Sequence, residues 1–190
     1  MRVILIPGTF ANTGRDAPQD DWWRPGSPFV LAAKEHGLEC LSLAWSTELD
    51  GVIGPDSGWQ KGAKRLYNQT WTLQPLTILA HSHGGQLPPL AAVYYGLKIR
   101  RLITMATPVR SDIPYKEARP NIEHWIHVFG GVRDYVQIIG ELAVLEFHVL
   151  RRKMAYADEN LCFPECDHSE VHTVEAWDRH GMWEKVKVVP

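Results

Sequence analysis

Short apolar segments alternate along this chain with longer segments that have the residue spacing of amphipathic helices. This alternation is typical of a parallel sheet that carries helices on both faces. Several of the short segments are apolar at successive positions, as expected of strands that are covered on both sides. We therefore predict a three-layer α/β sandwich of about six mostly parallel strands. The predicted strands are residues 2–6, 39–44, 76–80, 101–105, 124–129 and 160–163.

The helical segments and the chain length indicate one domain. The predicted helices are residues 29–36, 58–71, 83–95 and 174–186, with a further helix within 136–150. A length of 190 residues corresponds to about one domain, and no repeat or linker divides the chain. We predict a single domain over residues 1–190 without a separate lid domain. Ligands of open α/β sheets bind beyond the carboxyl ends of the strands, so the Pro/Gly-rich stretches 7–28 and 105–120, which each follow a strand, are the expected walls of a site.

Composition excludes several classes of function. The chain has 20 basic and 22 acidic residues, a net charge of −2, whereas general nucleic-acid binding needs a basic surface. Its apolar stretches are too short to span a bilayer, so we expect no stable membrane anchor. The first apolar run leads directly into Pro7-Gly8 without a signal-peptide pattern, and three cysteines are too few for a disulfide framework. We therefore expect a cytoplasmic protein.

A serine-centred motif follows the third predicted strand. Residues 76–85 read LTILAHSHGG, a strand that leads into a tight turn and a helix. The core of this segment is a variant of the nucleophile elbow G-x-S-x-G, in which Ala80 replaces the first glycine. The tight turn requires small residues around Ser82 and holds the serine in a strained conformation. We predict Ser82 as a nucleophile and the backbone N–H of His83 as an oxyanion donor. The alternative is a turn whose serine caps the following helix.

A second oxyanion donor is expected from the loop after the first strand. Gly8 allows the backbone to turn close to a substrate, which leaves the N–H of Thr9 or Phe10 as the candidate donor. The aromatic residues of the same loop, Phe10, Trp22 and Trp23, are candidates for the apolar wall of an acyl or aromatic-ester pocket. Simple packing of the loop is the other interpretation of these side chains.

A serine nucleophile needs a histidine base, and nine histidines compete for this role. His81 and His83 flank Ser82 and cannot easily fold back onto its hydroxyl, so we interpret them as packing or pocket-lining groups. His168 lies between a predicted strand and the last helix, which is the loop position that a base needs. His172, at the start of that helix, is the alternative.

The histidine in turn needs an acidic partner to hold its ring. Asp134 follows the strand 124–129 and two glycines, so it lies at the carboxyl edge of the predicted sheet. Asp112, in the loop after the preceding strand, is the alternative acid. Asp167 is adjacent to His168 and is badly placed to hold the ring of its neighbour.

Together these residues resemble the α/β-hydrolase fold superfamily, and the chain is similar in size to its small lipases and esterases. The resemblance implies a catalytic triad of Ser82, Asp134 and His168, with the backbone donors described above. It implies a hydrolase that cleaves a small carboxylic ester through an acyl-enzyme, without a cofactor. A thioesterase, acyltransferase or amidase on the same triad is the alternative. The chain lacks the H-G-G-G stretch found at the oxyanion position in some members and has no long insertion for a lid, which favours an open pocket.

A zinc site is a rival interpretation of the C-terminal segment. Cys162, Cys166, His168 and His172 form the pattern C-x3-C-x-H-x3-H, and all four residue types bind zinc. Only one residue separates the two pairs, however, so four tetrahedral ligands would require a very tight wrap. A metal site would also remove His168 from the triad, and we predict no metal.

Overall fold

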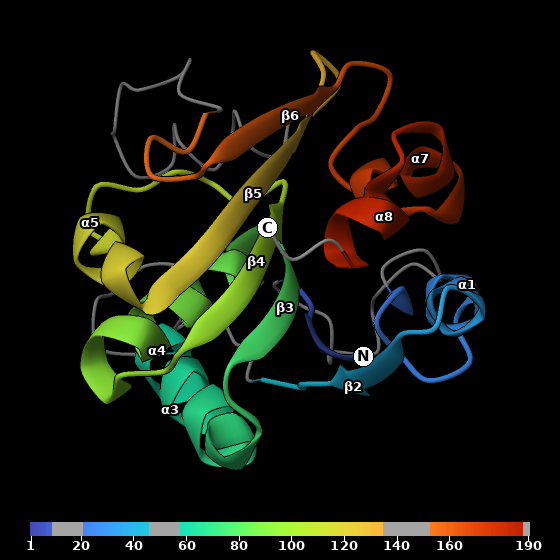
Figure 1. The fold of residues 1–190 in the computed structure, drawn as a ribbon. Helices are drawn as coiled ribbons and strands as arrows, with labels where there is room; N and C mark the ends of the chain where they lie inside the picture. The colour runs from blue at the N-terminus through green and yellow to red at the C-terminus, as the bar shows by residue number, and fades with distance from the viewer. Residues whose placement is uncertain (9–20, 46–57, 135–152, 188–190) are drawn as a thin grey trace.

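The computed structural model describes residues 1–8, 21–45, 58–134 and 153–187, and the six predicted strands lie within these ranges (Figure 1). They form one sheet in the order β2-β1-β3-β4-β5-β6, in which every neighbouring pair is parallel. The strands are β1 (Arg2–Ile6), β2 (Glu39–Ser42), β3 (Leu76–His81), β4 (Ile99–Met105), β5 (Ile122–Gly130) and β6 (Glu159–Phe163). The predicted fold class is therefore confirmed.

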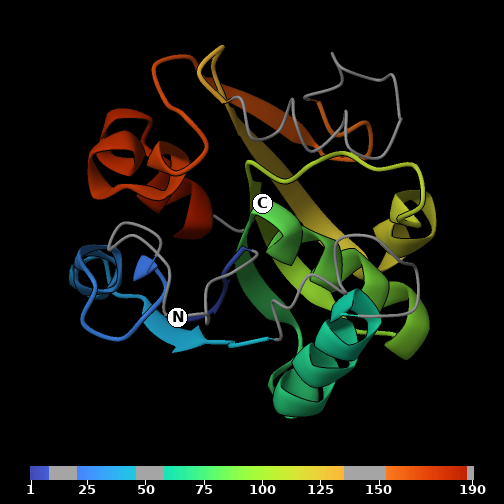
Figure 2. The ribbon, with the colours of Figure 1, turned by 180° about the vertical axis from the view of Figure 1, so that it is seen from behind.

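Helices cover both faces of the sheet, as Figures 1 and 2 show from opposite sides. One face carries α1 (Pro28–Glu35), α7 (Val174–Arg179) and α8 (Met182–Lys187). The other face carries α3 (Gly58–Thr70), α4 (Leu87–Tyr95) and α5 (Tyr115–Ala118). Short 3₁₀ helices occur at η2 (Trp71–Leu73), η3 (Ser82–Gln86), η4 (Arg119–Asn121) and η5 (Glu170–His172). No helix in the described part of the chain is long and apolar enough to cross a bilayer.

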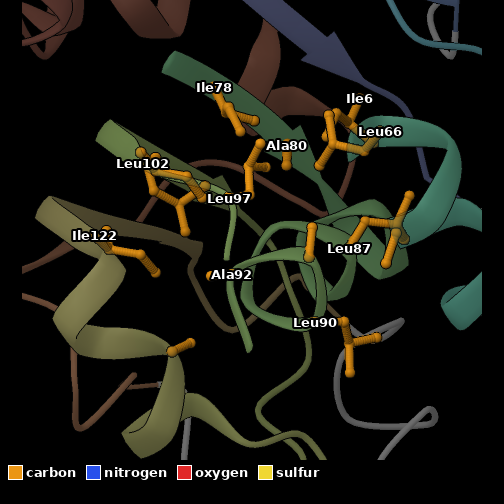
Figure 3. Packing of buried hydrophobic residues seen from close by; sticks show 14 of the residues in the cluster. Ile6, Leu66, Ile78, Ala80, Leu87, Leu90, Ala92, Leu97, Leu102 and Ile122 are labelled. Carbon is orange, nitrogen blue, oxygen red and sulfur yellow. The ribbon is translucent and has the colours of Figure 1, made fainter. Parts of the chain in front are cut away.

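Two hydrophobic clusters, one on each side of the sheet, form the core. Successive strand residues point to opposite faces, so Ile4 packs beneath α3 and α4 whereas Leu5 packs beneath α1 and α8. Figure 3 shows the first cluster, in which Ile78 and Ala80 of β3 lie on the face of the sheet that Leu87 of α4 covers. Every residue of β3 is buried, as expected for a central strand with helices on both sides.

The helix predicted over residues 83–95 begins differently from the prediction. Residues Ser82–Gln86 form a 3₁₀ helix, and the α-helix starts at Leu87. Pro88 and Pro89 have no N–H, so they cannot donate the α-helical hydrogen bonds to the carbonyls four residues earlier. The same prolines are well tolerated in the first turn of α4. The α-helix ends at Gly96, which has a φ of 69°, the left-handed conformation common after helix ends.

The prediction of a single helix over residues 174–186 was also wrong. The segment forms two helices, α7 and α8, because Gly181 between them has a φ of 62° that interrupts the helical backbone. The sequence analysis also missed α5, because four residues are too few to show a helical period. The helix predicted within residues 136–150 lies outside the described residues.

The order of the strands predicts where a ligand would bind at the edge of the sheet. From β1 the chain goes outward to β2 and then returns to β3 on the other side of β1. Such a reversal separates the loops that leave the two central strands, and ligands of open α/β sheets bind there. The loops in question begin at Pro7 after β1 and at Ser82 after β3.

Candidate active site

Ser82 occupies a strained turn at the carboxyl end of β3. Its φ is 52°, in the left-handed region that residues other than glycine rarely adopt. Two residues later, a Cβ atom added at Gly84 would lie 2.2 Å from the carbonyl oxygen of Pro7. The glycine is therefore required because the turn packs directly on the loop after β1. The sequence motif thus has the local geometry of a nucleophile elbow.

Ser82, His168 and Asp134 are joined by a continuous chain of hydrogen bonds. The Ser82 Oγ lies 3.0 Å from His168 Nε2, and His168 Nδ1 lies 3.0 Å from Asp134 Oδ1. A carboxylate can only accept, so the proton of a neutral His168 belongs on Nδ1. This leaves Nε2 free to accept the hydroxyl proton of Ser82. The Asp134 side chain is completely buried, whereas that of His168 is 12% exposed.

Close contact between two loops brings Asp134 and His168 together. The N–H of Gly131 donates to the carbonyl of Cys166 at 3.0 Å, and the N–H of Asp134 turns back to the carbonyl of Gly131 at 3.1 Å. A Cβ atom at Gly131 would lie 2.0 Å from the carbonyl oxygen of Pro164. Gly131, directly after β5, therefore allows the loop with Asp134 to lie against the loop that leads to His168.

The two other aspartates considered above have different roles. Asp167 Oδ1 accepts from the backbone N–H groups of Ser169 and Glu170, at 2.8 and 2.9 Å, and so shapes the turn around His168. Asp112 is bound by both Arg110 Nε and Nη2 at 2.8 Å, and this hydrogen bonding lowers its pKa. Asp134, not the alternative Asp112, is therefore the carboxylate that contacts the base.

Three further histidines surround the hydrogen-bond chain, and all have lowered pKa values. Burial, followed by the charges of His172 and His168, lowers the pKa of His81 well below its ordinary value. Burial and the nearby Arg110 lower the pKa of His83 to about 4, and burial and His168 lower that of His172 to about 3. These imidazoles are neutral at pH 7. His172 was the alternative base, but its ring packs on His81, at 4.5 Å between centroids, and the contact with the serine hydroxyl is made by His168.

The start of the predicted oxyanion loop, Pro7-Gly8, lies beside Ser82. A Cβ atom at Gly8 would lie 2.9 Å from Ser82 Cβ and 3.5 Å from its Oγ. The preceding peptide is fixed by Trp45, whose Nε1–H donates to the carbonyl of Pro7 at 2.8 Å. The predicted donors Thr9 and Phe10 lie outside the described residues.

The other predicted donor, His83, lies in the first turn of η3, directly after Ser82. Its ring stacks on Trp59 at 5.8 Å between centroids. The His83 side chain therefore lies against α3.

The tryptophans considered as a pocket wall belong to the core. Trp22 and Trp23 are 4% and 5% exposed and lie in the cluster beneath α1 and α7. Trp22 packs edge-on against Phe29 and stacks on His172, with centroids 5.0 and 5.2 Å apart. The structure favours the packing interpretation of both side chains.

A cavity of about 770 Å³ lies along the loop after β4, one of the two stretches expected to form walls of a site. It is lined by residues 109–117 and 153–156. At one end of this lining, the guanidinium of Arg110 lies 4.8 Å from the ring centroid of Trp59, which in turn stacks on His83. A continuous row of side chains thus connects the cavity with the residue next to Ser82.

The four residues of the rival zinc pattern do not form a metal site. Cys162 is exposed on β6, whereas Cys166 and His172 are buried, and His168 is engaged with Ser82 and Asp134. Among the described residues, no three histidine, cysteine or acidic side chains are grouped closely enough to hold a metal ion.

Comparisons with known proteins identify the fold. The sequence matches no protein-family model and no curated protein. Among solved structures, it is similar to a predicted CIB-like hydrolase from Thermoplasma acidophilum, with a TM-score of 0.60, 14% identity and coverage of 98% of this chain and 86% of the other. An α/β serine hydrolase without a lid from Xanthomonas campestris matches with a TM-score of 0.56 and 14% identity, over 97% of this chain and 79% of the other. A methylesterase from Arabidopsis matches with a TM-score of 0.57 and 14% identity, over 98% and 99%. The chain therefore has the α/β-hydrolase fold, as its motifs predicted.

Proposed function

We propose that this protein is a serine hydrolase that cleaves small carboxylic esters through an acyl-enzyme on Ser82. The observation that carries the proposal is the hydrogen-bond chain from Ser82 through His168 to Asp134, with both distances at 3.0 Å. Its serine occupies a strained turn at the carboxyl end of β3, next to β1 in the sheet. The fold supports the same class of reaction, since the similar solved structures include a serine hydrolase and a methylesterase.

The mechanism follows from where the protons lie. His168 Nε2 takes the hydroxyl proton of Ser82 as Oγ attacks the ester carbonyl, and the buried carboxylate of Asp134 stabilises the resulting imidazolium. Backbone N–H groups of His83 and of Thr9 or Phe10 stabilise the oxyanion. His168 then gives its proton to the departing alcohol, and the acyl group remains on Ser82. In the second half, His168 activates a water molecule that releases the acid and regenerates the serine.

The substrate is expected to extend from Ser82 past His83 toward the cavity beside Arg110. The cavity lining is mixed in character, with apolar Met154 and Ile113 beside charged groups. A long fatty acyl chain placed against this lining would bury its charged groups away from water, which is unfavourable. We therefore expect a small ester that carries polar groups.

Hydrolysis of a p-nitrophenyl ester series from acetyl to palmitoyl, with and without a zinc chelator, tests the proposal. We expect short-chain esters to be cleaved, with no effect of the chelator, and Ser82→Ala to lower kcat by at least about 10³-fold. A fluorophosphonate probe should label the wild type and not the variant. Labelling without ester turnover would favour a thioester or amide substrate. Wild-type turnover by Ser82→Ala would refute the proposal.

A further inference from the structure

His81, the residue just before Ser82, contacts the backbone of His168. Its Nε2 lies 2.9 Å from the backbone carbonyl oxygen of His168, a residue 87 positions away in the sequence. A carbonyl oxygen can only accept, so the proton of the His81 ring is on Nε2 and is donated to this carbonyl. The elbow and the loop of the base are thereby joined by a side-chain hydrogen bond.

The His81 side chain is held in this position by its surroundings. It is 7% exposed, and its ring packs edge-on against His172 at 4.5 Å and lies 6.5 Å from Trp22. Its other nitrogen faces the loop after β1, since a Cβ atom at Gly8 would lie 3.3 Å from His81 Nδ1. One buried ring therefore lies between the nucleophile, the base loop and the oxyanion loop.

The geometry points to His81 as a positioning residue that sets the location of the His168 imidazole relative to Ser82. This inference rests on the proposed function, because it assigns His81 a task in a triad that uses His168 as base. His168 follows Asp167 in a loop whose turn is shaped by short-range bonds, and the His81 bond ties its carbonyl to the rigid end of β3. The bond fixes the backbone from which the imidazole must reach both Ser82 and Asp134.

Neutral His81 is also compatible with the charge that develops beside it. The rings of His81 and His168 have centroids 4.9 Å apart, and His168 becomes positively charged when it takes the serine proton. A second positive imidazole at this distance would oppose that step. Burial keeps the pKa of His81 well below its ordinary value, so its ring adds no such charge.

Substitutions of His81 that keep or remove its donor test the inference. His81→Phe keeps an aromatic ring but loses the bond, whereas His81→Gln places an amide N–H near the position of Nε2. Without the His81 bond, the His168 imidazole can shift by up to about 1 Å from its position beside Ser82. We therefore expect His81→Phe to lower kcat about 10- to 100-fold with little change in KM. We expect His81→Gln to recover most of this loss. His36→Phe is the matched control, because it makes the same change in a histidine ring that stacks on Trp183 of α8, and it should keep the wild-type kcat.

A spectroscopic measurement separates this inference from the proposed ester hydrolysis. The Nδ1–H proton of His168, bonded to Asp134, gives a downfield proton resonance in NMR spectra that needs no substrate. We expect this resonance in the wild type and in His81→Gln, and its loss or broadening in His81→Phe. An inactive wild type with this pattern would refute the ester substrate but support the role of His81.

Equal losses of kcat in His81→Phe and His81→Gln, or an unchanged resonance and kcat in His81→Phe, would overturn the inference. Circular dichroism checks that each variant is folded. If His81→Phe does not fold, His81→Asn replaces it, because its shorter amide cannot reach the carbonyl of His168. We expect His81→Asn to lose kcat and the Nδ1–H resonance as described for His81→Phe. A wild-type kcat and resonance in His81→Asn would overturn the inference.

Discussion

Replacing Asp134 with asparagine should inactivate the protein without unfolding it. The change is nearly isosteric, and the side chain is fully buried beside His168 Nδ1. An asparagine amide that donates to Nδ1 forces the His168 proton onto Nε2, where it blocks acceptance of the Ser82 proton. An asparagine oxygen turned toward Nδ1 keeps the tautomer but supplies no negative charge for the imidazolium.

The burial of this carboxylate determines the size of the effect. No water reaches Asp134 to replace its charge, since the side chain has no exposed surface. Loss of the acid from a Ser-His-Asp arrangement costs about 10⁴-fold in kcat, or about 5.4 kcal/mol of transition-state stabilisation. We expect Asp134→Asn to lose kcat by about 10³- to 10⁴-fold, with a small change in KM, because the carboxylate is not in contact with the substrate in the proposed mechanism.

The assay is steady-state hydrolysis of the best p-nitrophenyl ester, with thermal denaturation as the check on folding. Asp112→Asn is the matched control: it makes the same change at the alternative acid, whose carboxylate binds Arg110 and is partly exposed. We expect this control to keep kcat within about threefold of the wild type, because the Asp112 carboxylate contacts Arg110 and not His168. A kcat for Asp134→Asn within tenfold of the wild type, or an equal loss in the control, would refute the reasoning.

Two further substitutions test the surroundings of the site. Burial and His168 lower the pKa of His172 to about 3. As the pH falls below about 6.5, His172 therefore takes up a proton in the unfolded chain but not in the folded protein. The stability that the protein has at pH 7 is consequently lost in part toward pH 3. His172→Phe should therefore reduce the difference in unfolding free energy between pH 7 and pH 5 by about 2 kcal/mol in urea titrations, and an unchanged difference would contradict the burial argument. Gly84→Ala should cost about 1–3 kcal/mol of stability and about 100-fold in kcat, because its methyl group would meet the carbonyl of Pro7 at 2.2 Å. Wild-type kcat in a folded Gly84→Ala would show that the elbow and the oxyanion loop need not pack so closely.

The fold could be predicted because its central strands are short and mostly apolar. In β3 every residue is buried, and the apolar run 78–80 leads directly into the serine motif. The boundaries were less accurate where a special backbone conformation decides them. Gly181 divides the last helix by its left-handed φ, and a glycine is a known stop signal that could have revealed the break.

The three residues that the hydrogen bonds join could be predicted because each follows a strand. The order serine, acid, histidine along the chain, combined with the rule that sites form at the carboxyl ends of strands, indicated Asp134 and His168. The contacts that hold these residues could not be predicted. The N–H of Gly131 meets the carbonyl of Cys166, and Nε2 of His81 meets the carbonyl of His168. In each contact an N–H group meets a carbonyl that is distant in the sequence, and no local sequence pattern specifies such a partner.

The departure from the usual elbow motif has a physical explanation in these contacts. Ala80, which stands in place of the first glycine, is buried in the cluster beneath α4, where its methyl group packs beside Ile78 (Figure 3). Gly84, the second small residue, has no such space, because the carbonyl of Pro7 occupies the position of a methyl group. The two ends of the motif therefore face different surroundings, the hydrophobic core on one side and the neighbouring backbone on the other. A motif with alanine at the first position and glycine at the second is consequently sufficient for this turn, and the requirement for glycine arises from tertiary packing with the loop after β1.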